Sequence, residues 1–203
     1  MVGAEFVHLH VHTEFSLLDG MIRIKDLIER AVAFQMPAVA ITDHGAMFGA
    51  VSFYKQARDN GIKPIVGCEV YVAPNKRTDR DEVGHHLVLL CKNYRGYQNL
   101  CRMVSASYLE GFYYKPRIDF ELLAEHNDGL IALSACLKGE IASALKVDDL
   151  DRATAAAGRL KEIFSGNRFY LELQENGIAD QLKVNRELIA LGRKLNLPLV
   201  ATN

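Results

Sequence analysis

The sequence predicts an α/β fold in which seven β-strands alternate with helices and form a barrel. Short apolar runs alternate along the chain with segments whose apolar residues have helical spacing, which is the pattern of parallel β/α units. Several runs are apolar on both faces, as strands in a buried parallel sheet are. Polar residues gather where the strands end, and β/α barrels and open doubly wound sheets both place active sites there. The first strand lacks the glycine-rich phosphate loop that often follows it in open sheets, which favours a barrel.

The predicted strands are runs of aliphatic and aromatic residues bounded by Gly, Pro, Asn or Asp. They cover residues 6–12, 37–42, 63–72, 85–91, 130–136, 168–174 and 197–203. The predicted helices carry apolar side chains three or four positions apart. They cover residues 22–35, 47–59, 95–110, 119–126, 139–146, 149–164 and 179–195. Two other segments are predicted to be irregular. The charged stretch at 74–84 is predicted to be a solvated loop, with a phosphate-binding arm as the alternative, and 112–118 is an aromatic, basic connector.

The composition is that of one domain over residues 1–203, without an overall basic field. Apolar residues make up 49% of the chain, enough for a sizeable core, and the formal net charge is −1. A near-neutral chain needs a local patch or a partner region to hold nucleic acid. The N-terminus shows no signal peptide, and no apolar run is long enough to span a membrane. The four cysteines form no C-x-x-C pair, which argues against a zinc ribbon or disulfide framework and indicates a reducing, cytoplasmic location.

A histidine-rich stretch in the first predicted strand is the strongest chemical signal. His8, His10 and His12 alternate with apolar residues, so in a strand all three imidazoles share one face. Imidazole is the commonest metal ligand, and buried rings need partners for both nitrogens. Asp19 follows just before a glycine turn, where it is placed to add an oxygen donor. The stretch therefore predicts a metal site, with a polar stripe on the surface as the alternative.

Five short motifs occur in order along the chain, each at or near the end of a predicted strand. They are His10-Val-His12-Thr, Thr42-Asp-His44-Gly, Gly67-Cys-Glu69-Val-Tyr, His86-Leu and Leu133-Ser-Ala-Cys136. With these motifs the chain resembles the PHP (polymerase and histidinol phosphatase) domain family. Stretches such as Phe-Ser-Leu-Leu-Asp-Gly and Gly-Phe-Tyr-Tyr-Lys-Pro-Arg-Ile-Asp are similar to the branch at the N-terminus of bacterial DNA polymerase III alpha subunits. The resemblance covers essentially the whole chain.

The resemblance implies a distorted (β/α)7 barrel with up to three divalent metal ions at the carboxyl ends of its strands. The ligands that it implies are His10, His12, Asp19, His44, Glu69, His86 and Cys136. It selects His86 over its neighbour His85 as the inward ring. His8 lies one layer deeper on the same face, so we interpret it as a residue that packs or that supports a ligand, and we interpret Asp43 as a carboxylate that orients His44.

The end of the chain departs from the family pattern. In this family the last strand continues from Ala-Thr-Asn into Asp-x-His, which supplies two further ligands. This chain stops at Asn203, so the resemblance implies a barrel truncated near its last strand, within a larger polymerase subunit. We therefore expect weaker metal occupancy and little or no hydrolysis from these residues alone.

The implied ligands indicate phosphate chemistry at a metal centre. Mixed imidazole, carboxylate and thiolate donors suit zinc, with manganese or iron as competitors. Ions about 3.5–4 Å apart can clamp a phosphate and lower the pKa of bound water to about 7. The candidate catalytic residues are Asp19, Lys115 and Arg117, of which the two basic ones would offset phosphate charge or else pack against tyrosines. Cys136 is either a ligand or a small buried residue.

Two functions from different classes fit these residues. In the first, the domain is a metal-dependent phosphoesterase of a replicative DNA polymerase, acting on the primer 3′ end as a 3′–5′ proofreading exonuclease or hydrolysing pyrophosphate. In the second, the metal only stabilises a scaffold for the polymerase body of the same chain and a docking site for a separate proofreading exonuclease. Nucleotidyl transfer would reside in later domains. A free-standing histidinol-phosphatase-like enzyme fits less well, because the polymerase-type stretches continue beyond Tyr94.

Overall fold

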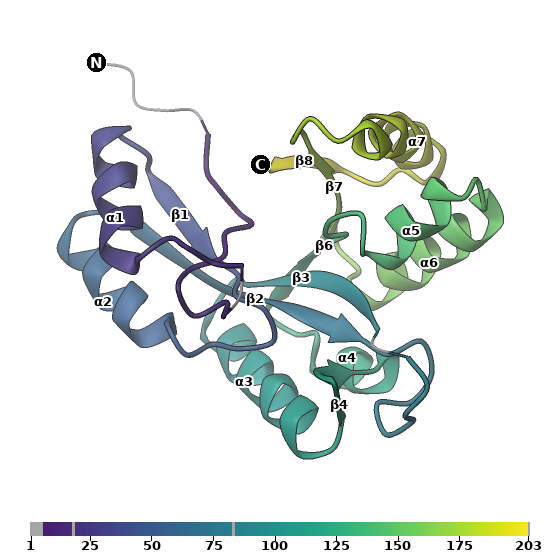
Figure 1. Cartoon of the computed structure of the whole chain (residues 1–203), viewed down its shortest axis with the longest axis horizontal. Helices are drawn as coiled ribbons and strands as arrows, with labels where there is room; N and C mark the ends of the chain where they lie inside the picture. Colours follow the sequence, from purple (N-terminus) through teal and green to yellow (C-terminus); the bar gives the residue numbers. More distant parts are fainter. Residues whose placement is uncertain (1–5, 18, 83, 203) are drawn as a thin grey trace.

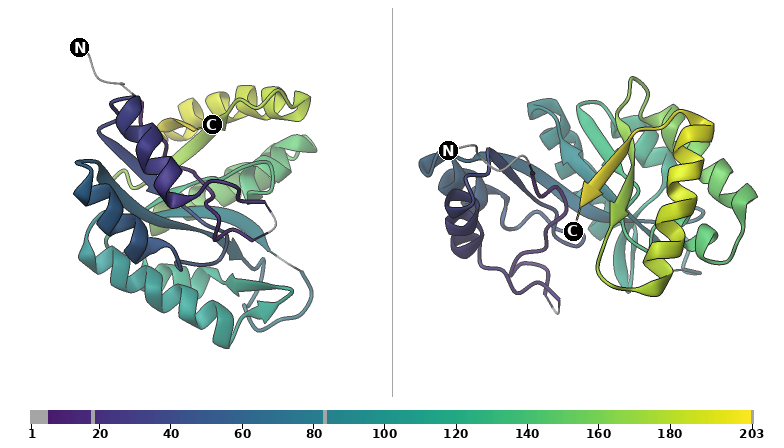
Figure 2. Two further views of the ribbon diagram at one scale, coloured as in Figure 1. Left: turned by 60° about the vertical axis from the view of Figure 1, so that its left-hand side comes forward. Right: turned by 90° about the horizontal axis from the view of Figure 1, so that it is seen from above.

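A single curled β-sheet forms the centre of the molecule, and helices cover its convex side (Figures 1 and 2). The computed structural model describes residues 6–17, 19–82 and 84–202. Its strands are β1 (Ala38–Ile41), β2 (Lys63–Val72), β3 (His85–Cys91), β4 (Phe112–Tyr113), β5 (Lys115–Ile118), β6 (Leu130–Leu133), β7 (Phe169–Gln174) and β8 (Leu199–Thr202). They lie in the order β4-β5-β2-β3-β6-β7-β8, and β1 pairs with the first half of β2.

All the helices predicted from apolar spacing are present, and their ends lie within three residues of the predicted ends. They are α1 (Ile24–Ala33), α2 (Ala50–Asp59), α3 (Tyr94–Leu109), α4 (Phe120–His126), α5 (Glu140–Lys146), α6 (Leu150–Ile163) and α7 (Ala179–Leu195). Each longer helix buries one face against the sheet or a neighbouring helix, as an amphipathic helix does. Within the described residues, no helix has the length and apolar character needed to cross a membrane.

The predicted α/β class is confirmed, but the prediction that all strands are parallel is wrong. β3 runs antiparallel to both β2 and β6, whereas β1–β2, β6–β7 and β7–β8 are parallel pairs. The physical reason lies in the loop at 74–84, which has no helix. Two parallel strands need a crossover, usually a helix, that returns the chain to the end of the sheet where the first strand began. A loop without a crossover instead leads directly into an antiparallel strand. The connector at 112–118 is also regular in part, because β4 and β5 form a small hairpin and β5 extends the sheet beside β2.

The first predicted strand, residues 6–12, is an extended segment without regular strand pairing. It runs beside β1, where the amide of Ala40 donates to the carbonyl of His8 at 2.8 Å and the amide of Thr42 donates to the carbonyl of Val11 at 2.8 Å. Two steps along β1 and its continuation, from Ala40 to Thr42, thus match three steps along the segment, as in a β-bulge, so the alternation of faces is interrupted between His8 and Val11. The segment lies across the open side of the sheet from β8 (Figure 1).

The central strands are buried on both faces. In β3, Leu87 and Leu89 pack outward into the main core against the helices, whereas Val88 and Leu90 pack inward on the concave side. This is the two-residue period of a strand with apolar layers on each side. The concave side also contains a cavity of about 780 Å³ lined by residues that include Leu9, Ile65 and Tyr170. The lining includes the first residues of β2, Lys63–Val66, and none of the predicted metal ligands.

The charged loop at 74–84 is tied to the fold by a buried carboxylate. Asp119 caps α4 by accepting from the amide of Leu122 at 3.0 Å, and it also accepts from the amide of Arg77 at 3.0 Å and from its guanidinium at 2.9 Å. Burial opposes ionisation of Asp119, but these hydrogen bonds outweigh it and hold the pKa of the carboxyl below its ordinary value.

Replacing Asp119 with alanine should destabilise the fold by about 2–4 kcal/mol, because it removes a helix cap and the buried acceptor of the Arg77 amide and guanidinium. Asp149→Ala is the matched control, since Asp149 caps α6 through the amide of Arg152 alone, and it should cost about 1 kcal/mol. The measurement is urea unfolding of both variants. The stabilisation from Asp119 is present above its unfolded pKa and is lost as the pH falls through its lower folded pKa, so the deficit should shrink below about pH 4. Equal losses in the two variants would contradict the anchoring role.

Candidate metal centre

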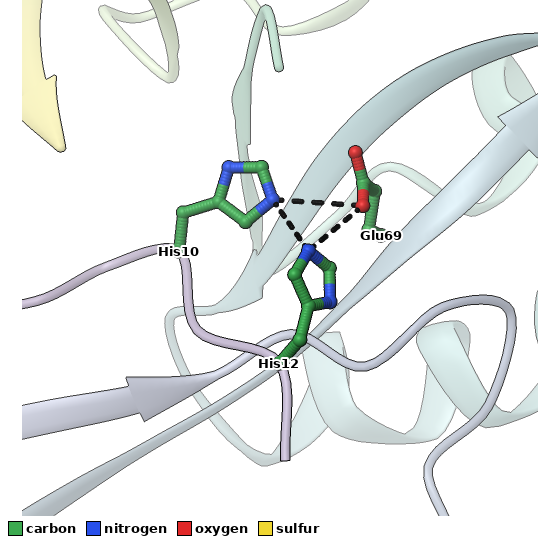
Figure 3. A group of neighbouring side chains, drawn as sticks. All are labelled: His10, His12 and Glu69. Carbon is green, nitrogen blue, oxygen red and sulfur yellow. Dashed lines mark hydrogen bonds and ion pairs between the residues drawn. The ribbon is translucent and has the colours of Figure 1, made fainter. Parts of the chain in front are cut away.

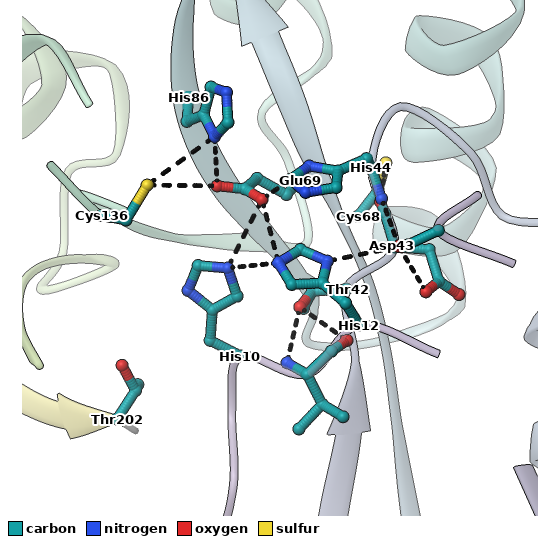
Figure 4. Close-up of polar contacts among 12 residues, drawn as sticks. His10, His12, Thr42, Asp43, His44, Cys68, Glu69, His86, Cys136 and Thr202 are labelled. Carbon is teal, nitrogen blue, oxygen red and sulfur yellow. Dashed lines mark hydrogen bonds and ion pairs between the residues drawn. The ribbon is translucent and has the colours of Figure 1, made fainter. Parts of the chain in front are cut away.

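Four imidazoles surround the buried carboxylate of Glu69, which lies in the second half of β2 and is 1% exposed (Figure 4). Oε2 of Glu69 lies 3.5 Å from Nε2 of His10, 3.2 Å from Nε2 of His12 and 2.9 Å from Nδ1 of His44. Oε1 lies 2.7 Å from Nδ1 of His86. Imidazoles from three separate segments therefore meet at one carboxylate of β2.

Backbone pairing places these side chains. The segment after β1 continues alongside β2, where the amide of Glu69 donates to the carbonyl of Asp43 at 3.1 Å and the amide of Gly45 donates to the carbonyl of Glu69 at 2.9 Å. This sets His44 beside Glu69. On the other edge of β2, His86 of β3 is paired with Tyr71, two residues from Glu69 and on the same face of the strand. Gly45 has φ of 61°, and a Cβ there would lie 2.6 Å from the Pro116 ring, so a larger residue would disturb this turn.

Asp43 has a different role from the predicted one. Its Oδ1 accepts from the amide of Thr13 at 2.6 Å and the hydroxyl of Ser16 at 2.8 Å, and its Oδ2 accepts from the hydroxyl of Thr13 at 2.8 Å. Asp43 therefore holds the turn that follows His12, and it does not hydrogen-bond to the His44 ring in the described structure. Ser16 in turn accepts from the amide of His44 at 3.1 Å, so the carboxylate reaches His44 only through this hydroxyl.

Asp19 lies on the exposed side of the cluster. Its Oδ2 contacts Nε2 of His44 at 2.8 Å, and 56% of its side chain is exposed. Asp19 therefore contacts one nitrogen of the His44 ring, and Glu69 faces the other.

The geometry fits divalent cations. The possible ligand atoms form two triads, His10–His12–Glu69 (Figure 3) and His44–Glu69–His86, and within each triad these atoms lie within 4.8 Å of one another. Oε2 of Glu69 and Nδ1 of His44 are buried and have no hydrogen-bond partner among the described residues, although they lie 2.9 Å apart. A cation between such atoms would satisfy both, because each offers a lone pair when the imidazole is neutral. Glu69 belongs to both triads, so its carboxylate is the group that would bridge two ions.

Ionisation of the cluster favours cations as well. Burial alone would lower the pKa of His10, but its hydrogen bonds with Glu172 and Glu69 raise that pKa to about 10. Burial would likewise lower the pKa of His44, and contacts with Glu69 and Asp19 raise it instead. Positive charge is thus stabilised around Glu69, and a metal ion that supplies this charge must displace protons from the rings.

Cys136 lies at the edge of the second triad. Its Sγ is 3.8 Å from Nδ1 of His86 and 4.0 Å from Oε1 of Glu69. Burial raises the pKa of the thiol to about 11, so a thiolate there requires a nearby cation. The inward position of His86 agrees with the sequence prediction, since the adjacent His85 instead contacts Arg152 at 3.2 Å.

The two basic candidates have different surroundings. Lys115 is exposed, and its Nζ lies 5.7 Å from the ring centre of Tyr71, which itself contacts the rings of His44 and His86. Arg117 is 1% exposed, and its guanidinium donates to four backbone carbonyls. Those bonds leave Arg117 without a free face for phosphate, so the expectation that it offsets phosphate charge is not retained.

Glu172 is a buried residue of the cluster for which the sequence indicated only a polar position at a strand end. Its Oε1 lies 2.6 Å from Nδ1 of His10. The signal for it was the two-residue period of β7, because Tyr170, Glu172 and Gln174 occupy alternate positions and so share the inward face. His8 is outside both triads, and its ring contacts Phe6 with centroids 5.0 Å apart.

Comparison with known proteins identifies this arrangement. The PHP domain model matches residues 8–176. DNA polymerase III subunit alpha of Thermus aquaticus is 50% identical over 207 residues, which cover 98% of this chain and 17% of the relative. The corresponding subunit of Aquifex aeolicus is 44% identical over 211 residues, covering 99% of this chain and 18% of the relative. The chain thus spans less than a fifth of the length of these relatives.

Solved structures share the fold at low sequence identity. A crystal structure from Bifidobacterium adolescentis, assigned as a metal-dependent phosphoesterase, superposes with a TM-score of 0.56 at 14% identity, covering 97% of this chain and 86% of that one. A two-domain protein from Bacteroides vulgatus, with a domain assigned as a PHP-like phosphoesterase, gives 0.55 at 14% identity, covering 97% and 50%. The curled sheet, the two histidine–glutamate triads and the match over residues 8–176 show that the chain belongs to the PHP domain family and corresponds to the N-terminal region of DNA polymerase III alpha subunits.

Proposed function

We propose that this domain is a metal-dependent phosphoesterase within a replicative DNA polymerase III alpha subunit. The observation that carries the proposal is the sharing of buried Glu69 by two ligand triads, since paired cations bridged by one carboxylate suit phosphoester hydrolysis. Zinc fits the donor set best, with manganese or iron as competitors. Asp19 and Cys136 both lie beside the second triad, next to His44 and His86, and would add donors to it.

In this proposal each side chain of the cluster has a separate role. When bound, the cations would act as Lewis acids and lower the pKa of a bound water. Glu69 and the imidazoles would hold them, while Asp19 and the partly exposed His12 mark the side from which a phosphate enters. Lys115, exposed beside Tyr71, is the basic side chain placed to offset phosphate charge. The substrates that suit the parent polymerase are the primer 3′ end and pyrophosphate, and the place of action is the cytoplasm.

The second candidate function is a metal-stabilised scaffold, and one observation favours it. The ligands come from the first segment, β2, β3 and the loops after β1 and β6, and the first segment has few backbone bonds to the sheet. A cation would therefore tie this segment to the fold, and binding energy would become folding energy. In this role the domain would support the polymerase body and dock a separate proofreading exonuclease.

One experiment separates the two functions. The metal-stripped protein is titrated with Zn²⁺, Mn²⁺ or Fe²⁺, and hydrolysis of bis(p-nitrophenyl) phosphate and of a labelled primer 3′ end is measured together with Tm. Both this chain and a polypeptide that continues beyond it are tested. We expect metal to raise Tm and produce hydrolysis in the longer polypeptide, with little hydrolysis from this chain alone.

His12→Ala should reduce hydrolysis by more than about 100-fold, since even groups that only support a ligand contribute 10–100-fold. His126→Ala, at the end of α4 and outside both triads, should match the wild type. A rise in Tm without hydrolysis in either polypeptide would favour the scaffold, and no metal effect at all would exclude both functions.

A further inference from the structure

Glu172 lies on the inward face of β7, is 1% exposed and faces the first segment across the open side of the sheet. Its Oε1 meets three donors, with Nδ1 of His10 at 2.6 Å, Nε2 of Gln174 at 2.9 Å and Oγ1 of Thr202 at 2.5 Å. Glu172 does not belong to either ligand triad. It nevertheless contacts a proposed ligand directly, from the side opposite Glu69.

The two nitrogens of the His10 ring have different neighbours. Nδ1 points to Glu172, and Nε2 points to the cluster, where it lies 3.2 Å from Nε2 of His12 and 3.5 Å from Oε2 of Glu69 (Figure 4). A neutral imidazole carries its proton on one nitrogen only. An ionised carboxylate can accept hydrogen bonds but cannot donate them. The ring nitrogen that faces it must therefore carry the hydrogen.

We propose that Glu172 is a positioning residue that fixes the metal-binding form of His10. By accepting a hydrogen bond from Nδ1–H, Glu172 keeps the proton on Nδ1 and leaves the lone pair on Nε2, the atom that faces the triad. The same contact holds the ring plane and makes the imidazole a stronger donor, as carboxylates behind histidine ligands do. This inference rests on the proposed function, because it assumes that His10 binds a cation.

The surroundings of Glu172 make it suited to this role. Gln174 and Thr202 donate to the same oxygen, so the carboxylate is held by its own strand and by β8. Its second oxygen, Oε2, is buried and has no hydrogen-bond partner among the described residues. The contact with His10 also links the first segment to β7 and β8. In the described part of the chain, the first segment has no backbone pairing with either of these strands.

The test measures zinc affinity in buffers with a chelator that sets free Zn²⁺, for the wild type, Glu172→Gln and Glu172→Ala. Glutamine keeps the size and an acceptor oxygen but loses the charge, so affinity should fall about tenfold, and alanine should lower it about 100-fold. Glu175→Gln changes an exposed residue just beyond β7 and should leave affinity unchanged. Thermal unfolding of each metal-free variant shows that it is folded before titration.

A second readout follows the ring itself. In long-range ¹H–¹⁵N spectra of the zinc-loaded wild type, His10 should be protonated at Nδ1 and coordinated through Nε2, and in Glu172→Ala this single form should be lost. Affinities within twofold of wild type in both variants, with Nδ1 still protonated, would overturn the inference and leave the proposed function intact. A wild type that binds no zinc would overturn the proposed function together with the inference.

Discussion

Replacing Glu69 with glutamine should remove metal binding from both triads at once, because each triad depends on this one carboxylate. The affinity for Zn²⁺ should fall by more than about 100-fold, since loss of a supporting group alone costs 10–100-fold. Glutamine keeps the shape of the side chain, so the effect reports the charge. Calorimetric titration of the metal-stripped protein checks the prediction, with Glu125→Gln as control. Glu125 also lies beside a histidine, His126 at 3.9 Å, but is exposed.

The metal-free protein should also be less stable after this change. Burial by itself would raise the pKa of Glu69, but its contacts with four imidazoles hold that pKa well below the ordinary value. Removing the charge leaves protonated His10 buried without one of its two carboxylate partners, which should cost about 3–5 kcal/mol. Unchanged unfolding free energy in Glu69→Gln would contradict this account of the cluster.

The pH dependence of the unfolding free energy follows from the lowered pKa of Glu69 and the raised pKa of His10. The contribution of Glu69 is present above its unfolded pKa and is lost as the pH falls through its lower folded pKa. The contribution of His10 is present below its unfolded pKa of about 6.5 and is lost as the pH rises toward its folded value of about 10. The stability difference between wild type and Glu69→Gln should therefore be largest near pH 5–6 and decrease on either side, as urea unfolding across this range would show.

Replacing Arg117 with methionine should have the second large effect, on stability rather than on metal binding. Nε of Arg117 donates to the carbonyl of Gly111 at 3.1 Å, and its terminal nitrogens donate to the carbonyls of Glu82, Arg77 and Asp79 at 2.6, 2.8 and 2.5 Å. Methionine fills similar space but donates nothing, so four carbonyls lose a charged donor. We expect a loss of about 3–5 kcal/mol, less than the sum of four bonds because loop carbonyls can turn to water.

Urea unfolding and amide exchange test this prediction, and exchange should increase in residues 76–82. Arg95→Met is the control, because Arg95 is exposed and its single ion pair with Asp128 spans 3.6 Å, so the change should cost less than about 1 kcal/mol. Zinc affinity of Arg117→Met should stay near wild type under conditions where it is folded. A folded Arg117→Met of normal stability with weakened binding of phosphate esters would instead restore the phosphate role expected from the sequence.

The sequence by itself determined the elements of the fold and most of the cluster. Helical spacing predicted each helix, and apolar runs predicted β1, β2, β3, β6, β7 and β8 close to their observed bounds. These patterns are local, since a strand or helix repeats its buried face every two or three to four residues. The alternating histidines pointed to His10 and His12, and the resemblance to the PHP family added His44, Glu69 and His86; the structure brings all five side chains together.

Only the tertiary structure decided which side chains face one another. It placed Glu69 at the centre of four imidazoles, set Glu172 behind His10 from 162 positions away, and turned Arg117 inward to the loop carbonyls. It also reversed β3, because the loop at 74–84 joins β2 to β3 without a helical crossover. The physical reason is that packing and burial of the whole chain select hydrogen-bond partners that are distant in sequence. The periodicity of a single segment carries no information about these partners.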